Sequence, residues 1–143
     1  MIVELLPPHT GRAFEAMREL RPGLTSMDEF VQRVDQRQRP EGYRLVASVP
    51  DAHGPAVGVA GFRVGENLAW GRHLYVDDLS TVPSARQQGH ARDLLAWLHG
   101  EAARLDCVQV HLDSGVGVGR TAAHRLYFNA GYRISSHHFM REV

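Results

Sequence analysis

The amino-acid sequence predicts an α/β fold, in which helices cover both faces of a mixed β-sheet of about six to seven strands. Three observations predict it. Short strand-like segments separated by turns fill the first half, a long amphipathic helix directly follows one strand, and another strand, CVQVHL, follows that helix. A strand, a helix and a second strand connected in this way form a parallel pair with a right-handed crossover. We therefore expect both parallel and antiparallel pairs in one sheet.

The first part of the chain predicts one strand and two helices. Residues 2–6 form the strand, which two consecutive prolines end. The next helix spans about residues 10–20. One side of that helix is apolar and carries Ala13, Phe14, Met17 and Leu20. A second helix begins after Ser26, because Ser26 as the N-cap and Glu29 three residues later form a capping box.

The middle of the chain predicts three strands, at residues 43–49, 56–64 and 68–82. The turns between them lie at residues 51–55 and 65–67. The second of these strands contains the small and apolar segment VGVAGF, which indicates burial on both faces. The third is long enough to hold a bulge near its two adjacent aspartates, Asp77 and Asp78.

The remaining part of the chain predicts two helices and two further strands. The long amphipathic helix starts at Gly89, and its apolar stripe consists of Ala91, Leu94, Leu95, Leu98, Ala102 and Leu105. A strand at residues 107–112 follows it. After a glycine-rich loop come a short helix at residues 120–130 and a last strand at residues 132–141. We expect all of these elements to form one domain, residues 1–143.

Charge and hydropathy exclude several classes of protein. The 16 basic residues balance the 16 acidic ones, which argues against a nucleic acid or an anionic membrane as the partner. No apolar run approaches the length of about 20 residues that a membrane span needs. The first residues lack the basic start and the long apolar core of a signal peptide. These features fit a cytoplasmic protein.

Cysteine and histidine spacing gives no indication of a metal or a disulfide. The one cysteine, Cys107, excludes an internal disulfide and a cysteine-based zinc site. Because Cys107 begins a predicted strand, we expect it to be a small buried residue and not a nucleophile. No two histidines have the H-x-x-x-H spacing of a helical metal site, so we expect no metal cofactor.

The turn before the long helix has the features of a diphosphate site. It consists of Arg86, Gln87, Gln88, Gly89, His90 and Ala91. The first turn of a helix carries unpaired N–H groups and the positive end of the helix dipole. Gly89 lets a ligand approach the backbone closely, and Arg86 can pair with phosphate oxygens. The alternative is an ordinary connection between a strand and a helix.

Two motifs in this order resemble the GNAT family of N-acetyltransferases. The first is Thr81-Val82-Pro83 followed by Arg86-Gln87-Gln88-Gly89-His90-Ala91, which is similar to V-x-P and R/Q-x-x-G-x-G/A. The second is Ala123-His124-Arg125-Leu126-Tyr127-Phe128-Asn129-Ala130-Gly131-Tyr132, which is similar to A-x-x-F/L-Y-x-x-x-G-F/Y. The resemblance covers most of the chain and implies the mixed sheet of that family.

The resemblance implies acetyl-CoA as the co-substrate. In that family the pantetheine lies between two splayed strands and pairs with a strand backbone, here Leu79, Ser80 and Thr81. The turn at residues 86–91 would then hold the pyrophosphate. Relatives often carry an asparagine seven residues before the motif tyrosine. Arg120 stands there in this chain and can reach a phosphate or an acidic substrate instead.

The resemblance also implies a general acid, Tyr127. In the family the matching tyrosine commonly protonates the departing CoA thiolate. A phenol has an ordinary pKa of about 10, so it holds its proton at neutral pH. Two alternatives stay open. Tyr127 can instead be an aromatic residue of a core helix together with Leu126 and Phe128, or it can only position the sulfur.

The candidate for binding or deprotonating the amine is Asp77. Adjacent carboxylates in a regular strand point to opposite faces, so only one of Asp77 and Asp78 faces a site unless a bulge intervenes. Asp77 occupies the place where many relatives carry a glutamate before Asp-Leu. We predict that it binds the amine or acts as a base through water. Alternatively, one aspartate pairs with an arginine or a histidine and the other is solvated at a bulge.

Further side chains form a second rank of candidates. The additional candidate bases are His73, His111, His137 and His138. His111 and Asp113 lie on one face at the end of a strand and are candidates for the substrate site. The glycine-rich segment at residues 115–119 lacks the spacing of a phosphate-binding loop, so we interpret it as a flexible loop on the substrate side.

The sequence thus predicts an acetyl-CoA-dependent N-acetyltransferase. A primary amine, which we expect to be a small molecule, would attack the thioester directly in a ternary complex. The alternative is a CoA-binding or regulatory domain that keeps the fold without catalysis. A homodimer is compatible with the small residues of strand 56–62, which would tolerate a close partner.

Overall fold

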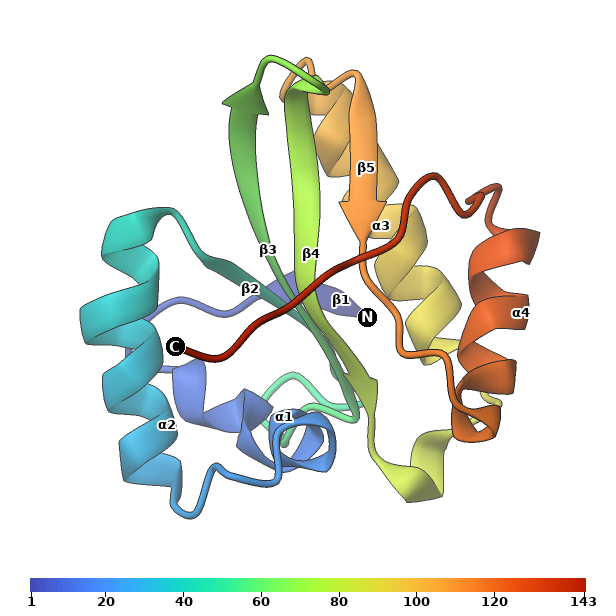
Figure 1. The fold of residues 1–143 in the computed structure, drawn as a ribbon. Helices are drawn as coiled ribbons and strands as arrows, with labels where there is room; N and C mark the ends of the chain where they lie inside the picture. Colours follow the sequence, from blue (N-terminus) through green and yellow to red (C-terminus); the bar gives the residue numbers. More distant parts are fainter. The chain divides into compact units, whose positions relative to one another are not determined.

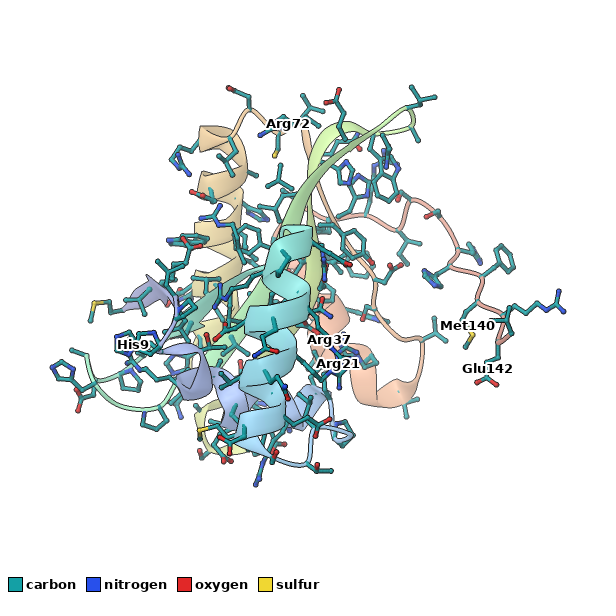
Figure 2. All side chains as sticks on the ribbon, turned by 90° about the vertical axis from the view of Figure 1, so that its left-hand side faces the viewer. His9, Arg21, Arg37, Arg72, Met140 and Glu142 are labelled. Atoms are coloured by element: carbon teal, nitrogen blue, oxygen red, sulfur yellow. The ribbon has the colours of Figure 1, made fainter.

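A computed structural model describes all 143 residues of the chain. They form two compact units, Met1–His111 and Leu112–Val143, and each unit is described by itself. The helices of the first unit are α1 (Phe14–Leu20), α2 (Met27–Arg33) and α3 (His90–Arg104). Charged side chains such as Arg37 and Arg72 lie on the surface of this unit (Figure 2). None of the helices combines the length and the apolar character that crossing a membrane requires.

A five-stranded sheet in the order β1-β2-β3-β4-β5 forms the centre of the first unit (Figure 1). The strands are β1 (Ile2–Glu4), β2 (Arg44–Ser48), β3 (Gly58–Asn67), β4 (Gly71–Thr81) and β5 (Gln109–Leu112). Neighbours from β1 to β4 pair antiparallel. After the α3 crossover, β5 runs in the same direction as β4 (Figure 1). The sheet is therefore mixed, as predicted, but its strand count is below the prediction.

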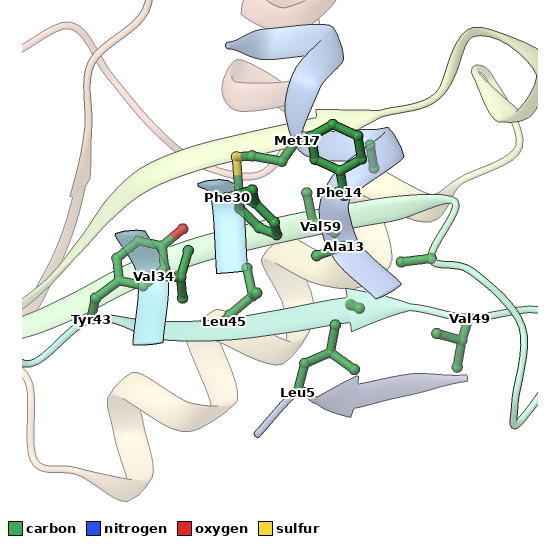
Figure 3. Packing of buried hydrophobic residues seen from close by; sticks show 13 residues of the cluster. Leu5, Ala13, Phe14, Met17, Phe30, Val34, Tyr43, Leu45, Val49 and Val59 are labelled. Atoms are coloured by element: carbon green, nitrogen blue, oxygen red, sulfur yellow. The ribbon is translucent and has the colours of Figure 1, made fainter. Parts of the chain in front are cut away.

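One face of the sheet packs against α1 and α2. The aromatic rings of Phe14 and Phe30 lie with their centroids 5.9 Å apart, and Leu45 and Val59 below them are fully buried (Figure 3). The residues of this core are Leu5, Ala13, Phe14, Ala16, Met17, Phe30, Val34, Tyr43, Leu45, Ala47, Val49, Ala56 and Val59. Ser26 caps α2, because its side chain accepts a hydrogen bond from the backbone of Glu29 at 3.1 Å, which confirms the predicted start of that helix.

The opposite face of the sheet packs against α3 (Figure 1). Leu94, Leu95 and Leu98 of the predicted apolar stripe are almost completely buried. The ring of Trp97 meets that of Phe62 edge-on, with centroids 5.9 Å apart. Both faces of β3 are therefore covered, as its small and apolar residues predicted.

An ion-pair network joins β1 and β2 to α3 beside this apolar layer. Arg44 donates to both carboxylate oxygens of Glu4 at 2.8 Å and to Oε1 of Glu101 at 2.6 Å. Arg104 donates to the same Glu101 carboxylate at 2.7 and 2.8 Å. The hydrogen bonds from Arg104 and Arg44 lower the pKa of Glu101 to about 2 against its burial. This network links the helix to the first two strands.

The hairpin between β3 and β4 turns later than predicted. β3 continues to Asn67, so the turn predicted at residues 65–67 is wrong. The side chain of Asn67 accepts a hydrogen bond from the backbone N–H of Trp70 at 2.7 Å, and Gly71 follows with a φ of +65°. An asparagine that bonds its own following backbone closes a turn locally, which moves the turn beyond the polar residues 65–67.

The second unit consists of a loop, a short 3-10 turn at Val118–Arg120, α4 (Thr121–Asn129) and a terminal segment. Gly131 ends α4 with a φ of +89°. The strand predicted at residues 132–141 is wrong, because this segment has no regular structure. A strand requires a neighbour that takes up its backbone hydrogen bonds, and the apolar side chains of this segment, such as Phe139 at 93% exposure, are not buried against one.

Candidate active site

A β-bulge in β4 turns two adjacent carboxylates toward the same face of the sheet. Asp78 pairs with Gly61 of β3 and Val76 pairs with Phe62, which leaves Asp77 as the extra residue. The side chains of Asp77 and Asp78 both contact residues on the side of α1 and α2. The predicted bulge is confirmed, and the simple alternation of the two aspartates is broken.

Both carboxylate oxygens of Asp78 have hydrogen-bond donors. Nε of Arg21 donates to Oδ1 at 2.8 Å, and the hydroxyl of Tyr43 donates to Oδ2 at 2.9 Å. The Asp78 side chain is 12% exposed. Burial and the Asp78 carboxylate raise the pKa of Tyr43 well above its ordinary value, so the phenol stays a donor. This carboxylate is therefore fully engaged by the chain itself.

Only Oδ2 of Asp77 accepts a hydrogen bond within the first unit, and Oδ1 accepts none there. Nε of Arg63 donates to Oδ2 at 2.8 Å, and the side chain of Gln38 in turn accepts from Arg63. The Asp77 side chain is 24% exposed. Burial raises the pKa of Asp77, and the charge of Asp78 adds to this, although the contact with Arg63 counteracts both. Both aspartates thus pair with arginines, whereas the alternative expected only one such pair.

Gly61 makes room for the side chain that holds Asp78. A Cβ atom at Gly61 would lie 1.9 Å from the hydroxyl oxygen of Tyr43 and 2.3 Å from its Cζ. The space that the small residues of β3 leave on this face is therefore filled by a ring of the same chain. Sequence reasoning missed Arg21, Tyr43 and Arg63, and the only signal for Tyr43 was a glycine inside a buried strand.

The turn between β4 and α3 has the backbone of an anion-binding loop. Gln87 and Gly89 have φ angles of 62° and 90°, and Gly89 is the N-cap of α3. Alternating left-handed residues of this kind turn successive N–H groups toward one point, and the first turn of α3 adds its own unpaired N–H groups. A Cβ atom at Gly89 would lie 2.9 Å from Nη2 of Arg92, a cation that sequence reasoning missed.

The side chains of residues 86–90 in this turn contact different parts of the chain. Arg86 is exposed, with its Nε 3.4 Å from the carbonyl oxygen of Thr81 and its Nη2 3.8 Å from the carboxylate of Glu19. The ring of His90 bonds through Nδ1 to the buried hydroxyl of Ser48 at 2.9 Å. His90 and Ala91 lie in the first turn of α3, where backbone N–H groups have no partner within the helix. The side chain of Gln88 donates to the carbonyl oxygen of Ser84 at 3.0 Å.

The end of β4 has one paired edge. Leu79, Ser80 and Thr81 pair with residues 58–60 of β3. On the other edge of β4 lies β5. Val108, the residue just before β5, donates a hydrogen bond to the carbonyl oxygen of Arg72 at 2.8 Å. Arg72 lies near the start of β4, at the opposite end from Leu79–Thr81. Since β5 is only 4 residues long, the second edge of Leu79–Thr81 lies beyond the reach of its pairing.

In the second unit, Tyr127 is a buried residue of α4 with 8% exposure. Its ring meets that of Tyr132 edge-on, with centroids 6.0 Å apart. Burial raises the pKa of Tyr127, and the nearby guanidinium of Arg120 lowers it in part. The phenol therefore holds its proton at neutral pH, next to the guanidinium of Arg120.

Two of the second-rank histidines form an aromatic cluster. The ring of His111 stacks on Trp70 with centroids 3.7 Å apart, and the buried His73 meets Trp70 edge-on at 5.0 Å. His73 bonds through Nδ1 to the carbonyl oxygen of Gly71 at 2.9 Å. These contacts give His73 and His111 a packing role at the hairpin end of the sheet.

The remaining second-rank candidates lie in the second unit. His138 approaches the carboxylate of Asp113 at 3.5 Å, and both side chains are more than half exposed. His137 lies in the exposed terminal segment. The glycine-rich loop is held to α4 by His124, whose Nε2 lies 2.8 Å from the carbonyl oxygen of Gly115. The structure contains no group of three or more histidine, cysteine, aspartate or glutamate residues suited to a metal ion.

Comparisons of the sequence with known proteins find one protein family and a relative. The family model described as the acetyltransferase (GNAT) family matches residues 12–132. A protein of Bacillus subtilis (strain 168) named uncharacterized N-acetyltransferase YhdJ is 30% identical over 134 residues, which cover 93% of this chain and 91% of that protein.

Comparisons of the structure give the same fold. Ribosomal-protein-alanine N-acetyltransferase from Brucella melitensis biovar Abortus 2308 matches with a TM-score of 0.82 at 15% identity, over 100% of this chain and 99% of the other. The structure of AAC(6')-Iy in complex with the bisubstrate analog CoA-S-monomethyl-acetylneamine matches with a TM-score of 0.81 at 16% identity, over 100% and 97%. With a family match over most of its length and the corresponding fold, this chain belongs to the GNAT family of acetyltransferases.

Proposed function

We propose that this chain transfers the acetyl group of acetyl-CoA to a primary amine of a small molecule, by direct attack in a ternary complex. The observation that carries the proposal is the β4–α3 segment. It combines a bulge aspartate with an open oxygen, a strand edge at Leu79–Thr81 and an anion-binding turn at residues 86–91. Membership of an acetyltransferase family supports the same reaction.

The residues present fit acetyl-CoA. The positive φ angles of Gln87 and Gly89 and the N-terminus of α3 suit a pyrophosphate, with the exposed Arg86 and Arg92 as counter-ions. The second edge of Leu79–Thr81 offers backbone groups to the amides of the pantetheine. When bound, acetyl-CoA supplies an activated acetyl thioester with a thiolate as the leaving group.

In this proposal Asp77 accepts the proton that the amine loses. An ammonium has no lone pair, so the amine must be deprotonated before it can attack. Oδ1 of Asp77 can accept a hydrogen bond from the amine directly or through water, while Arg63 holds Oδ2. The raised pKa of Asp77 makes it a better proton acceptor than an ordinary carboxylate.

Tyr127 serves as the proton donor to the departing thiolate. Its burial keeps the phenol protonated, and the adjacent Arg120 favours the phenolate once the proton has been given up. A further role of Arg120 is contact with an anionic group of the co-substrate, in place of the asparagine of relatives.

The first experiment measures the release of free CoA thiol from acetyl-CoA in the presence of a panel of primary amines. We expect amine-dependent release in the wild type. Asp77→Asn should lower kcat/KM for the amine about 100-fold, because a positioned acid or base contributes about that factor or more. Asp51→Asn, an exposed hairpin carboxylate, is the matched control and should retain full activity.

Binding of the co-substrate is measured separately by thermal shift with acetyl-CoA. A ligand at a hundredfold excess over its Kd stabilises the folded state by about 2.7 kcal/mol. Gly89→Glu should abolish the shift through its charge, whereas Gly89→Ala, which has the same backbone strain without the charge, should reduce it less. A shift without thiol release for any amine would favour a CoA-binding domain over an enzyme. No shift at millimolar acetyl-CoA would contradict the proposal altogether.

A further inference from the structure

We propose that Arg21 selects acceptor amines by their charge. It disfavours amines with a second positive charge and favours amines that carry an anionic group, such as a carboxylate or a phosphonate. This inference rests on the proposed function, in which the acceptor amine meets Asp77. It concerns which amine is accepted and not whether acetyl transfer takes place.

Arg21 lies directly on the bulge of β4. It follows the last residue of α1 and is labelled in Figure 2. Its side chain is 52% exposed. Its Nε donates to Oδ1 of Asp78 at 2.8 Å, and its Nη2 donates to the carbonyl oxygen of Asp77 at 2.9 Å. Any amine that contacts the Asp77 carboxylate is therefore within the length of a small molecule from this guanidinium.

The two carboxylates of the bulge are already matched by two guanidiniums. Arg21 and Tyr43 engage both oxygens of Asp78, and Arg63 engages one oxygen of Asp77. The first ammonium of an acceptor can reach the remaining oxygen of Asp77. A second ammonium finds no carboxylate of the bulge available, unless it displaces Arg21 and leaves that cation unpaired.

Arg21 also has donors left for an anion. A guanidinium has five N–H donors in a planar fork, and the two hydrogen bonds of Arg21 use Nε and Nη2. Its Nη1 group has no partner in the first unit and belongs to a half-exposed side chain. Carboxylates and phosphonates suit this fork, and charge-assisted bonds of this kind are the stronger class. Arg21 is therefore a specificity-determining residue in this proposal.

The test compares three primary amines of matched length that differ in the charge of the second group. Propylamine has none, β-alanine carries a carboxylate, and 1,3-diaminopropane carries a second ammonium. We expect kcat/KM to be highest for β-alanine and lowest for the diamine. A unit charge at about 4 Å changes an equilibrium constant about tenfold in a partly exposed site, so Arg21→Gln should raise the ratio of diamine to β-alanine about 100-fold.

Two further variants separate charge selection from structure. Arg18→Gln, on α1 with a side chain 50% exposed and paired with Glu15, should leave the ratio unchanged. Arg21→Lys keeps the charge and should keep the order of the three amines. A purely structural role of Arg21 would lower kcat/KM for all three amines by the same factor in Arg21→Gln, and that result would overturn the inference.

Calorimetric titration of the amines into the protein with bound CoA measures their affinities, and therefore the charge selectivity, in the absence of acetyl transfer. The predicted order of binding with no thiol release would support the selectivity and refute the proposed function. Thiol release with equal kcat/KM for the three amines, or a ratio that Arg21→Gln leaves unchanged, would refute the selectivity and leave the proposed function intact. Repeating the titration with 2-aminoethylphosphonate distinguishes a carboxylate acceptor from a phosphonate acceptor.

Discussion

Replacing Gly61 by alanine tests the contact that holds the bulge of β4. The added Cβ would lie 1.9 Å from the hydroxyl oxygen of Tyr43 and 2.6 Å from its Cε2, which is too close for any real contact. Tyr43 is 5% exposed and cannot move aside into solvent without opening the core. Its ring must shift, and the hydrogen bond of 2.9 Å to Asp78 is then lost.

The expected cost follows from these two events. A hydrogen bond to a charged group contributes about 1.5 to 3 kcal/mol, and inserting a methylene into a packed core costs about 1 to 3 kcal/mol. Alanine regains about 0.5 to 1 kcal/mol over glycine within a strand. We therefore expect Gly61→Ala to lower the free energy of unfolding by about 3 kcal/mol, a large part of the stability of about 5 to 15 kcal/mol of a typical domain.

Urea unfolding followed by circular dichroism measures this value in a double-mutant cycle with Tyr43→Ala. Without the ring, the alanine at position 61 has room, so its cost should disappear and the substitution should stabilise by about 0.5 to 1 kcal/mol. Gly100→Ala is the control, because a Cβ there meets nothing within 4 Å in the middle of α3, and it should stabilise by about 0.5 to 1 kcal/mol. An equal cost of Gly61→Ala with and without the Tyr43 ring would refute the reasoning.

Two further predictions concern titrating groups. Glu101→Gln should lower the free energy of unfolding by about 3 kcal/mol at neutral pH, because Arg44 and Arg104 both lose a carboxylate partner. The pKa of Glu101 is lowered from 4.5 to about 2, so this difference should be complete above pH 4.5 and disappear as the pH falls toward 2 in acid-unfolding titrations. Arg120→Gln should raise the pKa of Tyr127 further, measured as phenolate absorbance in an alkaline titration, while Arg125→Gln should leave it unchanged.

Much of the first unit could be predicted because its signals are local. The capping box at Ser26 and the apolar stripe of α3 each lie within a few residues of sequence, and they specify a helix start and a buried face directly. The last strand could not be predicted in this way. A strand at residues 132–141 would depend on a distant partner, which a local sequence pattern does not describe.

In the candidate site, too, local features could be predicted from the sequence and long-range contacts could not. The bulge was predictable, since two adjacent acids inside an apolar strand conflict with alternation, and a conflict of this kind marks a special backbone position. The partners of the acids were not, because Arg21, Tyr43 and Arg63 lie 57, 35 and 14 positions from the aspartates they contact. Nothing in the sequence around Arg21 and Arg63 distinguishes them from the other arginines, and only the fold brings these two to the aspartates. The charge around the proposed acceptor site therefore depends on long-range contacts, which local sequence patterns do not describe.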